Sequence, residues 1–465
     1  MKESLFQEFP DVPAEQWKDQ IKQDLKGASY DEKLIFRSLD GIAVQPFYTS
    51  ADVKDHMQLP PPLPWRICEK INVTSAGESN TQAAKALQKG AESLWLHISS
   101  EDVEPDVLFE GFNLENLQVH LSFSFFSPDY VERLKSYFKN KNTEVYLQLD
   151  VLGNLAVTGK WFFDQKRDFK VLKSVTETTP YFASTVSVNS DLYQNAGASI
   201  PQQLAFSLAH VNEYLNLVCQ KGEKQDQFQP QFILATGSNY FFEIAKIRAL
   251  RLLYASLAKE YGLPETCFIL AQPSQRDKTL YDYNVNLLRS TTQCMSAVLG
   301  GADAVSNQPY DLLFHKDSSF GRRIARNQLL VMKHEAYFDK VANPADGAYY
   351  IEHLTHEFAG KALEIFKQIE EEGGFLELLL KGELQKRIKV SAQKEQQLFD
   401  EGKLVLIGTN KFENSQDLMT QELEFDPFAK TSSEDTLIEP LFPVRLSEKL
   451  EQERLKKEQG ILTES

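Results

Sequence analysis

The chain has 465 residues, of which 42% are hydrophobic, and its 50 basic and 66 acidic residues give a net charge of −16. This length allows one large domain with accessory segments, or two domains. The acidic balance argues against nucleic acid or an anionic membrane as the main partner, because both attract basic surfaces. No apolar run approaches the roughly 20 residues of a membrane span, and the first residues carry no apolar signal segment. Four widely spaced cysteines favour reduced thiols. We expect a soluble cytoplasmic protein.

The first 67 residues contain one expected helix, Ala14–Lys26, and are otherwise irregular. The segment is short for a core of its own. Large apolar side chains are nonetheless frequent in it: Trp17, Leu25, Phe36, Phe47 and Tyr48. Apolar content of this kind needs a surface to cover. We therefore interpret residues 1–67 as an arm that lies on another surface.

From residue 68 onward, short β-type runs alternate with longer helical ones. Eight runs are expected to be strands: Cys68–Ser75, Ser93–Ser100, Leu117–Phe125, Glu144–Val151, Tyr181–Asn189, Gln231–Asn239, Cys267–Ser274 and Ala302–Pro309. Between them, Tyr240–Tyr261 repeats apolar residues with the period of an α-helix, and Gly262 follows as a C-cap. This alternation indicates a parallel sheet. Eight strands suit a (β/α)8 TIM-type barrel over residues 68–357. We prefer it to a doubly wound open sheet, because no glycine-rich phosphate loop follows the first strand.

Residues 358–465 are interpreted as a helical extension and a polar tail. Phe358–Phe399 is helical and charged, the run Lys403–Gly408 is typical of a short strand, and Ser447–Glu458 is a charged helix. The segment Leu441–Leu446 is apolar enough to dock on a neighbour, but a contact with the chain's own core is the simpler interpretation.

Few titratable residues lie at the C-terminal ends of the expected strands, where a barrel places its catalytic and binding residues. Those ends carry mostly hydroxyls and amides, with Asp150 as the one useful carboxylate, while His97 and His120 lie earlier in their strands. Acid–base catalysis near neutral pH usually requires a histidine or a tuned carboxylate or lysine. Asp150 is therefore interpreted as a capping or structural residue.

Two further clusters suggest binding sites but fit simpler roles. His353 and His356 lie three apart on an expected helix, yet no third ligand accompanies them, so surface positions are preferred to a zinc site. Arg322, Arg323 and Arg326 form a cationic patch. The patch suits CoA phosphates or an acidic partner, and equally well pairing with carboxylates of the barrel.

Several separated sequence motifs resemble motifs of the methylmalonyl-CoA mutases, the adenosylcobalamin-dependent isomerases, and they occur in the same order. They are DGIAVQPFYTSAD from Asp40, Pro64–Trp65, Gln194–Ala198 (QNAGA), Ala245–Arg251 (AKIRALR), Asn284–Asp303, Arg323–Gln328 (RIARNQ) and Asn343–Thr355. The resemblance extends over most of the chain, and it implies the same barrel.

Where catalytic chains of that family carry active-site residues, this sequence has others. The resemblance places Leu192 at the position of a histidine, Lys70 at that of a tyrosine, and Ser306 at that of a second histidine. The Asp-x-His-x-x-Gly loop, whose histidine ligates cobalt in catalytic relatives, does not occur in the sequence. The resemblance thus implies that this chain carries no catalytic, cofactor-binding or metal-binding residue.

The resemblance implies the small, non-catalytic subunit of a heterodimeric methylmalonyl-CoA mutase. The large subunit would bind adenosylcobalamin and interconvert methylmalonyl-CoA and succinyl-CoA, and the arm of this chain would wrap that partner. One alternative is a catalytic acyl-CoA mutase barrel that uses a separate cobalamin-binding protein, and another is an acyl-CoA sensor. If the first interpretation holds, side chains should fill the barrel axis, and Leu192 should pack among apolar neighbours.

Overall fold

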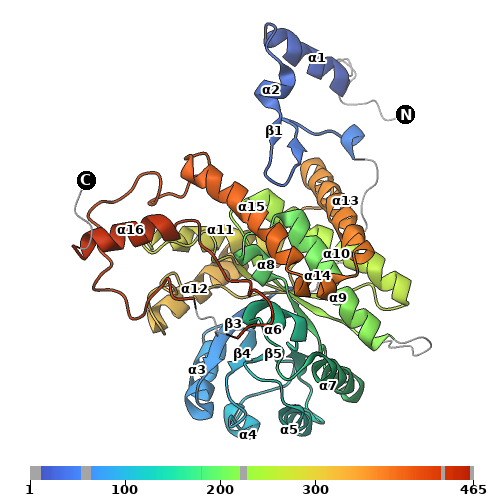
Figure 1. Ribbon diagram of the computed structural model, residues 1–465, viewed down its shortest axis with the longest axis vertical. Helices are drawn as coiled ribbons and strands as arrows, with labels where there is room; N and C mark the ends of the chain where they lie inside the picture. The colour runs from blue at the N-terminus through green and yellow to red at the C-terminus, as the bar shows by residue number, and fades with distance from the viewer. Residues whose placement is uncertain (1–11, 54–63, 180, 220–227, 431–434, 461–465) are drawn as a thin grey trace.

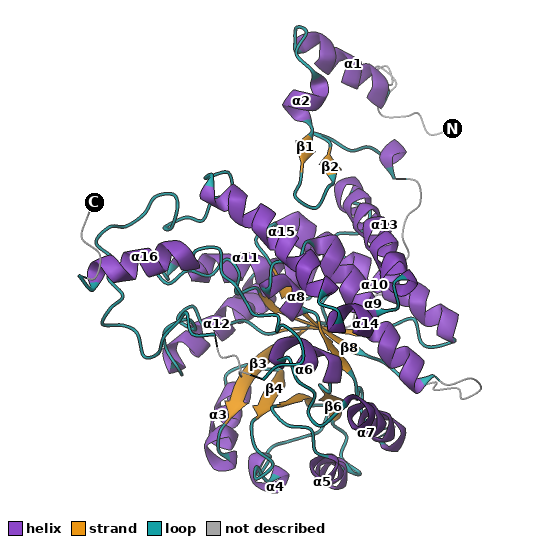
Figure 2. Cartoon of the chain, viewed as in Figure 1, coloured by secondary structure: helices purple, strands orange, loops and turns teal. Residues whose placement is uncertain are grey.

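Eight parallel strands form the centre of the protein in this computed structural model, which describes residues 12–53, 64–179, 181–219, 228–430 and 435–460. The strands are β3 (Arg66–Val73), β4 (Ser93–Ile98), β5 (Gln118–Phe123), β6 (Glu144–Leu147), β7 (Ser187–Asn189), β8 (Gln231–Thr236), β9 (Phe268–Pro273) and β10 (Ala304–Val305). β10 pairs with both β9 and β3. At the other junction the N–H of Leu147 donates to the carbonyl oxygen of Ser184, just before β7, at 2.8 Å. The sheet therefore closes into the predicted TIM-type barrel (Figures 1 and 2).

Helices surround the barrel: α3 (Ala76–Gln88), α4 (Pro105–Leu108), α5 (Pro128–Phe138), α6 (Val151–Thr158), α7 (Gln165–Thr178), α8 (Asp191–Asn195), α9 (Ile200–Val218), α10 (Tyr240–Tyr261), α11 (Val285–Leu299), α12 (Ser319–Leu330) and α13 (Tyr349–Glu371). The main apolar core lies between helices and sheet, because alternate residues of a strand face opposite sides. On β4, Leu94 and Leu96 belong to this core, whereas Trp95 belongs to a separate cluster inside the barrel. α10 begins and ends as predicted, and Gly262 caps it with a φ of 68°.

Bulky side chains close the barrel axis near the N-terminal ends of the strands. His120 on β5 and Tyr146 on β6 stack with their ring centroids 4.7 Å apart. Across the barrel, the ring of Phe268 on β9 lies 5.3 Å from that of His120 and 4.4 Å from that of Tyr146. Gln231 on β8 completes the layer with a hydrogen bond to His120 at 2.7 Å. Burial lowers the pKa of His120 to about 3, so the ring is neutral near physiological pH. The axis is filled at this level, as expected, but the C-terminal half of the barrel is not filled and keeps two cavities.

The N-terminal arm projects from the barrel (Figure 1). It consists of α1 (Ala14–Asp24), α2 (Tyr30–Leu34), the hairpin of β1 (Phe36–Arg37) and β2 (Ala43–Val44), and the short helix η1 (Ser50–Asp52). None of the residues of α1 is buried. The hairpin attaches the arm to the barrel: Ile42 is 1% exposed within the main core. The carboxylate of Asp40 also accepts the N–H of Ile200, at the start of α9, at 2.8 Å.

The C-terminal region adds α14 (Phe375–Leu380), α15 (Glu383–Asp400) and α16 (Glu448–Glu458). The expected boundary between residues 357 and 358 falls inside α13, which continues without a break. The prediction of a short strand at Lys403–Gly408 is wrong, because this run contributes only an isolated bridge between Ile407 and Lys411. A closed barrel offers it no free sheet edge for pairing.

Residues 435–446, here called the strap, lie against the C-terminal end of the barrel. Four of its backbone N–H groups donate to barrel carbonyl oxygens at 2.7 to 2.9 Å: Leu437 to Gly159, Leu441 to Ala156, Val444 to Asn195 and Leu446 to Arg276. The acceptors belong to segments that follow β6, β7 and β9. Leu441 and Leu446 are 6% and 3% exposed. The interpretation of Leu441–Leu446 as a contact with the chain's own core is confirmed.

Replacing Gly159 by alanine should strain the joint between strap and barrel. Gly159 has a φ of 73°, and an added Cβ would lie 2.7 Å from Cβ of Thr436 and 2.8 Å from the carbonyl oxygen of Ile438. The left-handed backbone costs alanine about 1–2 kcal/mol, and the collision adds about 1–3 kcal/mol. Urea denaturation of Gly159→Ala and of the control Gly262→Ala measures the loss of unfolding free energy in each. Gly262 has a φ of 68°, but nothing lies within 4 Å of an added Cβ there. Equal losses would contradict the collision.

The described part of the chain also bears on two expectations from composition. No helix there combines the length and the apolar content needed to cross a bilayer. All four cysteines carry free thiols, and three of them are buried, as expected for reduced side chains.

Candidate functional site

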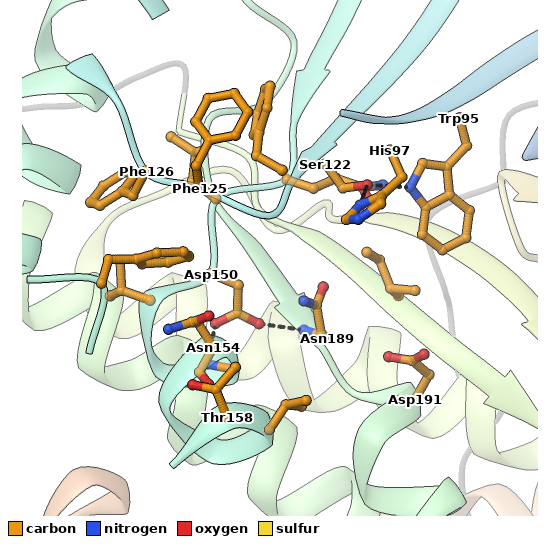
Figure 3. A pocket seen from close by; sticks show the side chains of 18 of the residues that line it. Trp95, His97, Ser122, Phe125, Phe126, Asp150, Asn154, Thr158, Asn189 and Asp191 are labelled. Carbon is orange, nitrogen blue, oxygen red and sulfur yellow. Dashed lines mark hydrogen bonds between the residues drawn. The ribbon is translucent and has the colours of Figure 1, made fainter. Parts of the chain in front are cut away.

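The C-terminal half of the barrel keeps open space beyond the filled layer. One cavity of about 270 Å³ lies at the ends of β4, β5 and β6. A second, of about 730 Å³, extends between β3, α3 and α12. Lys70 and Asp191 stand in the walls of both cavities. Figure 3 shows the smaller one, with Trp95 and His97 on one side and the aromatic side chains of Phe125 and Phe126 on the other.

Lys70 points into the barrel from β3, where it pairs in register with Trp95 of β4. Its Nζ lies 3.8 Å from the centroid of the Trp95 ring. The side chain lies deep in the barrel but is exposed to the cavities. Desolvation lowers the pKa of Lys70, and the carboxylate of Asp191 offsets part of that effect. Among the described residues, no hydrogen-bond acceptor or ion-pair partner contacts Nζ.

Asp191 opens α8, and its carboxylate accepts a hydrogen bond from Nε2 of Gln272 at 2.9 Å. Burial raises the pKa of Asp191, although the Lys70 cation works in the opposite direction. The next residue, Leu192, is 8% exposed and packs in the main apolar core. Ser306 is 2% exposed and lies in the wall of the larger cavity. Of the three positions singled out by resemblance, Lys70 and Ser306 thus line the same cavity.

His97 also lines the smaller cavity, although the sequence suggested no role for it. Its Nδ1 lies 3.0 Å from Oγ of Ser122, and its Nε2 lies 2.9 Å from Oγ of Ser124. Nε1 of Trp95 donates to the same Ser122 hydroxyl at 3.0 Å. Burial lowers the pKa of His97, and the nearby Lys70 cation lowers it further. The imidazole is therefore neutral near physiological pH and has both nitrogens engaged.

Gln148 is a second residue of the site that the sequence analysis missed. It follows β6 directly, is 5% exposed and lines the smaller cavity. The strand alternation could have found both residues: Tyr146 and Trp95 face the axis, so Gln148 and His97, each two residues further on, face the same side. Asp191 had no such signal, because it lies on a helix after β7.

Asp150 has a structural role, as predicted. Its Oδ1 accepts the N–H of Gly153 at 2.7 Å, which caps α6, and the hydroxyl of Tyr214 at 2.6 Å. Its Oδ2 accepts the N–H of Asn189 at 2.8 Å. Nε2 of His210 lies 2.9 Å from Oδ1. Burial by itself would raise the pKa of Asp150, but His210 and these hydrogen bonds outweigh it and hold that pKa below its usual value.

The histidine pair and the arginine patch make ordinary packing and ion-pair contacts within the chain. His353 packs on Tyr48 with ring centroids 4.8 Å apart, and His356 is exposed. In the part of the chain that the structure describes, no group of three or more metal-ligating side chains is present. Within the arginine patch, Arg326 pairs with the β3 carboxylate of Glu69 at 2.8 Å. This pairing with a barrel carboxylate is one of the two roles left open from the sequence.

A closed (β/α)8 barrel with polar groups at the C-terminal ends of its strands is the architecture of many enzymes. Comparison with known proteins narrows this class. The methylmalonyl-CoA mutase family profile matches residues 106–456. The methylmalonyl-CoA mutase small subunit of Porphyromonas gingivalis is 33% identical over 443 residues, which cover 89% of this chain and 72% of that protein. The small subunit of Streptomyces virginiae is 29% identical, covering 83% of this chain and 68% of that protein. Human mitochondrial methylmalonyl-CoA mutase is 28% identical, covering 95% and 66% respectively. The chain belongs to the methylmalonyl-CoA mutase family, as its sequence motifs predicted.

Proposed function

We propose that this chain is the non-catalytic small subunit of a heterodimeric methylmalonyl-CoA mutase. The large subunit would carry adenosylcobalamin and the interconversion of methylmalonyl-CoA and succinyl-CoA, and this chain would support it structurally. Two of the relatives bear the name of a small subunit, which supports a partner of that kind.

The observation that carries the proposal is the buried Leu192. Leucine can neither hydrogen-bond a thioester carbonyl nor transfer a proton, and this side chain packs in the apolar core beside the cavity wall. Positioning of the acyl group is what a protein contributes to a cofactor-driven rearrangement. The contact between His120 and Phe268 across the axis also leaves no passage there for an extended pantetheine chain.

The smaller cavity does not fit adenosylcobalamin. The one histidine of the smaller cavity, His97, has both ring nitrogens engaged by serine hydroxyls, so it offers no nitrogen to cobalt. The corrin ring with its nucleotide tail is also larger than the 270 Å³ of that cavity. These features support a cofactor held by the partner.

The purified chain, mixed with adenosylcobalamin and methylmalonyl-CoA, should form no succinyl-CoA. Turnover should appear when the large subunit is co-expressed, and an isolated cobalamin-binding protein should not replace that subunit. Succinyl-CoA formation, followed by chromatography of the CoA esters, is the measurement. Turnover with a cobalamin-binding protein alone would contradict the proposal.

That outcome would favour the second candidate, a catalytic acyl-CoA mutase barrel served by a separate cobalamin-binding protein. One observation favours this candidate: the cavities remain open and gather Lys70, His97 and Asp191. In that case Lys70→Met should abolish the turnover, whereas a structural subunit would keep the activity of its complex.

A further inference from the structure

The smaller cavity has two chemically different ends. One end is polar, with the Lys70 ammonium, the Gln148 amide and the Asp191 carboxylate. The other end is mostly aromatic and includes Phe123, Phe125, Phe126, Leu149, Val157 and Phe162, while Asn154 and Thr158, on the same helix as Val157, also line the cavity. Phe126 and Phe162 pack with their ring centroids 5.4 Å apart. In Figure 3, Phe125 and Phe126 lie on the opposite side of the view from Trp95 and Asp191. A molecule that fits both ends has a polar head and a short apolar body.

The charge at the polar end is incompletely compensated. Lys70 rests on the face of Trp95 at 3.8 Å, a contact worth about 0.5–2 kcal/mol and weaker than a full counter-charge in a desolvated site. Asp191 influences Lys70 through space, but the direct partner of its carboxylate is Nε2 of Gln272 at 2.9 Å. Asp150 belongs to the same wall and is occupied by His210 and by the N–H of Asn189. The positive charge of the Lys70 ammonium is therefore available to pair with an anionic group of a ligand.

Gln148 gives independent evidence for a ligand. The residue is 5% exposed, and among the described residues neither its Oε1 nor its Nε2 has a hydrogen-bond partner. A buried amide left unpaired costs about 1–3 kcal/mol, so buried polar groups are normally satisfied by protein, water or ligand. In the cavity wall with Lys70, its amide N–H group can donate to the same acceptor as the ammonium.

We propose that the cavity binds a small monocarboxylic acid with a compact aromatic or branched aliphatic body. The carboxylate accepts hydrogen bonds from Lys70 and from Nε2 of Gln148. The body packs between Phe125, Phe126 and Phe162. The cavity volume of about 270 Å³ limits the ligand to a small molecule, near the lower end of the usual range for ligand pockets. This site goes beyond the structural role proposed above, and the binding it describes requires no turnover.

Charge and size give the site a definite selectivity. A second carboxylate on the ligand would meet either the aromatic wall or the existing negative charges of Asp150 and Asp191. A dicarboxylate such as succinate is therefore disfavoured. A neutral amide of the same shape fills the apolar end, but it leaves the Lys70 cation without a counter-charge.

Isothermal titration calorimetry of the full chain with phenylacetate tests the proposal. Saturable binding at one site is expected, with isovalerate as a second ligand. Lys70→Met, which keeps the length of the side chain and removes its charge, should weaken phenylacetate binding roughly tenfold to hundredfold, as expected for loss of a hydrogen bond to a charged group. Gln148→Leu should weaken it by a smaller factor.

The control is Lys85→Met, which removes the charge of an exposed lysine on α3 and should leave the affinity unchanged. Thermal denaturation of each variant shows that it is folded. The proposal is overturned if phenylacetate gives no saturable heat at millimolar concentration, or if Lys70→Met binds it as tightly as the unaltered chain. Equal affinity for phenylacetamide or for succinate would overturn the assigned chemistry.

Discussion

Removing residues 1–34 should abolish co-purification with the large mutase subunit and leave the barrel folded. α1 buries none of its residues, and Trp17, 48% exposed, stacks on Phe47 of the arm with ring centroids 4.0 Å apart. An arm with this apolar content needs a surface to cover, and an obligate interface buries roughly 2,000 Å² or more. Co-expression followed by size-exclusion chromatography is the measurement.

The structure shows where this deletion has to end. Ile42 lies in the main core and Asp40 caps the start of α9. Removing residues 1–60 would therefore also destabilise the barrel, whereas the shorter deletion keeps both contacts. A matched pair of point variants refines the test: Trp17→Ser should lower the affinity for the large subunit. Phe412→Ser, at a residue of the C-terminal extension that is 74% exposed, should not. Full affinity after deletion of residues 1–34 would place the contact elsewhere.

Asp150→Ala should lower the free energy of unfolding by about 3–5 kcal/mol, the usual loss when one partner of a buried charge network is removed. The substitution leaves His210 and the hydroxyl of Tyr214 without their carboxylate and removes the cap of α6. Asp164 caps α7 at the surface by accepting the N–H of Arg167 at 2.9 Å. Asp164→Ala should cost only about 1 kcal/mol, the ordinary value of a cap. Similar losses in urea denaturation would argue against a buried network.

The lowered pKa of Asp150 also determines in which direction its contribution to the stability of the fold changes with pH. A carboxyl group with a depressed pKa in the folded state stabilises the fold fully above its unfolded pKa, which is about 3.9. That stabilisation is lost as the pH falls through the folded pKa. The difference in unfolding free energy between the unaltered chain and Asp150→Asn should therefore be constant near neutral pH and shrink below about pH 4. A difference that grows in acid would be inconsistent with this carboxylate.

The barrel was predictable because its signals are local. Each expected run overlaps a strand, although β3 begins at Arg66, two residues before the expected run, and helix α10 has the expected bounds. Strand lengths were less predictable: β10 shrinks to Ala304–Val305, and β7 to Ser187–Asn189. Residues near the end of a strand can still fit the β-type pattern of the sequence although they no longer pair with a neighbouring strand. The run Lys403–Gly408 failed for a different reason, since strand propensity does not reveal whether a partner edge exists.

The candidate site was only partly predictable. Resemblance drew attention to Lys70, but as a loss of function. Nothing in the local sequence indicated that its ammonium would rest on the Trp95 ring and line the same cavity as Gln148. Asp150 could be assigned correctly because a single carboxylate among hydroxyls and amides, with no histidine at the strand ends, is poorly equipped for acid–base catalysis. Contacts between strands set far apart in the chain depend on barrel closure, which no single segment encodes.

The strap has a consequence for the order in which the protein is made. Arg276 donates to the carbonyl oxygen of Val444, 168 residues further along the chain. All the strand residues of the barrel leave the ribosome well before the strap does. Domains begin to fold during synthesis, so a nascent barrel can close while its C-terminal end still lacks this cover. Contacts of such long sequence separation form slowly. The last step of maturation is therefore the docking of a late segment onto a barrel that has already formed, and a ribosome stalled before residue 435 would display that end uncovered.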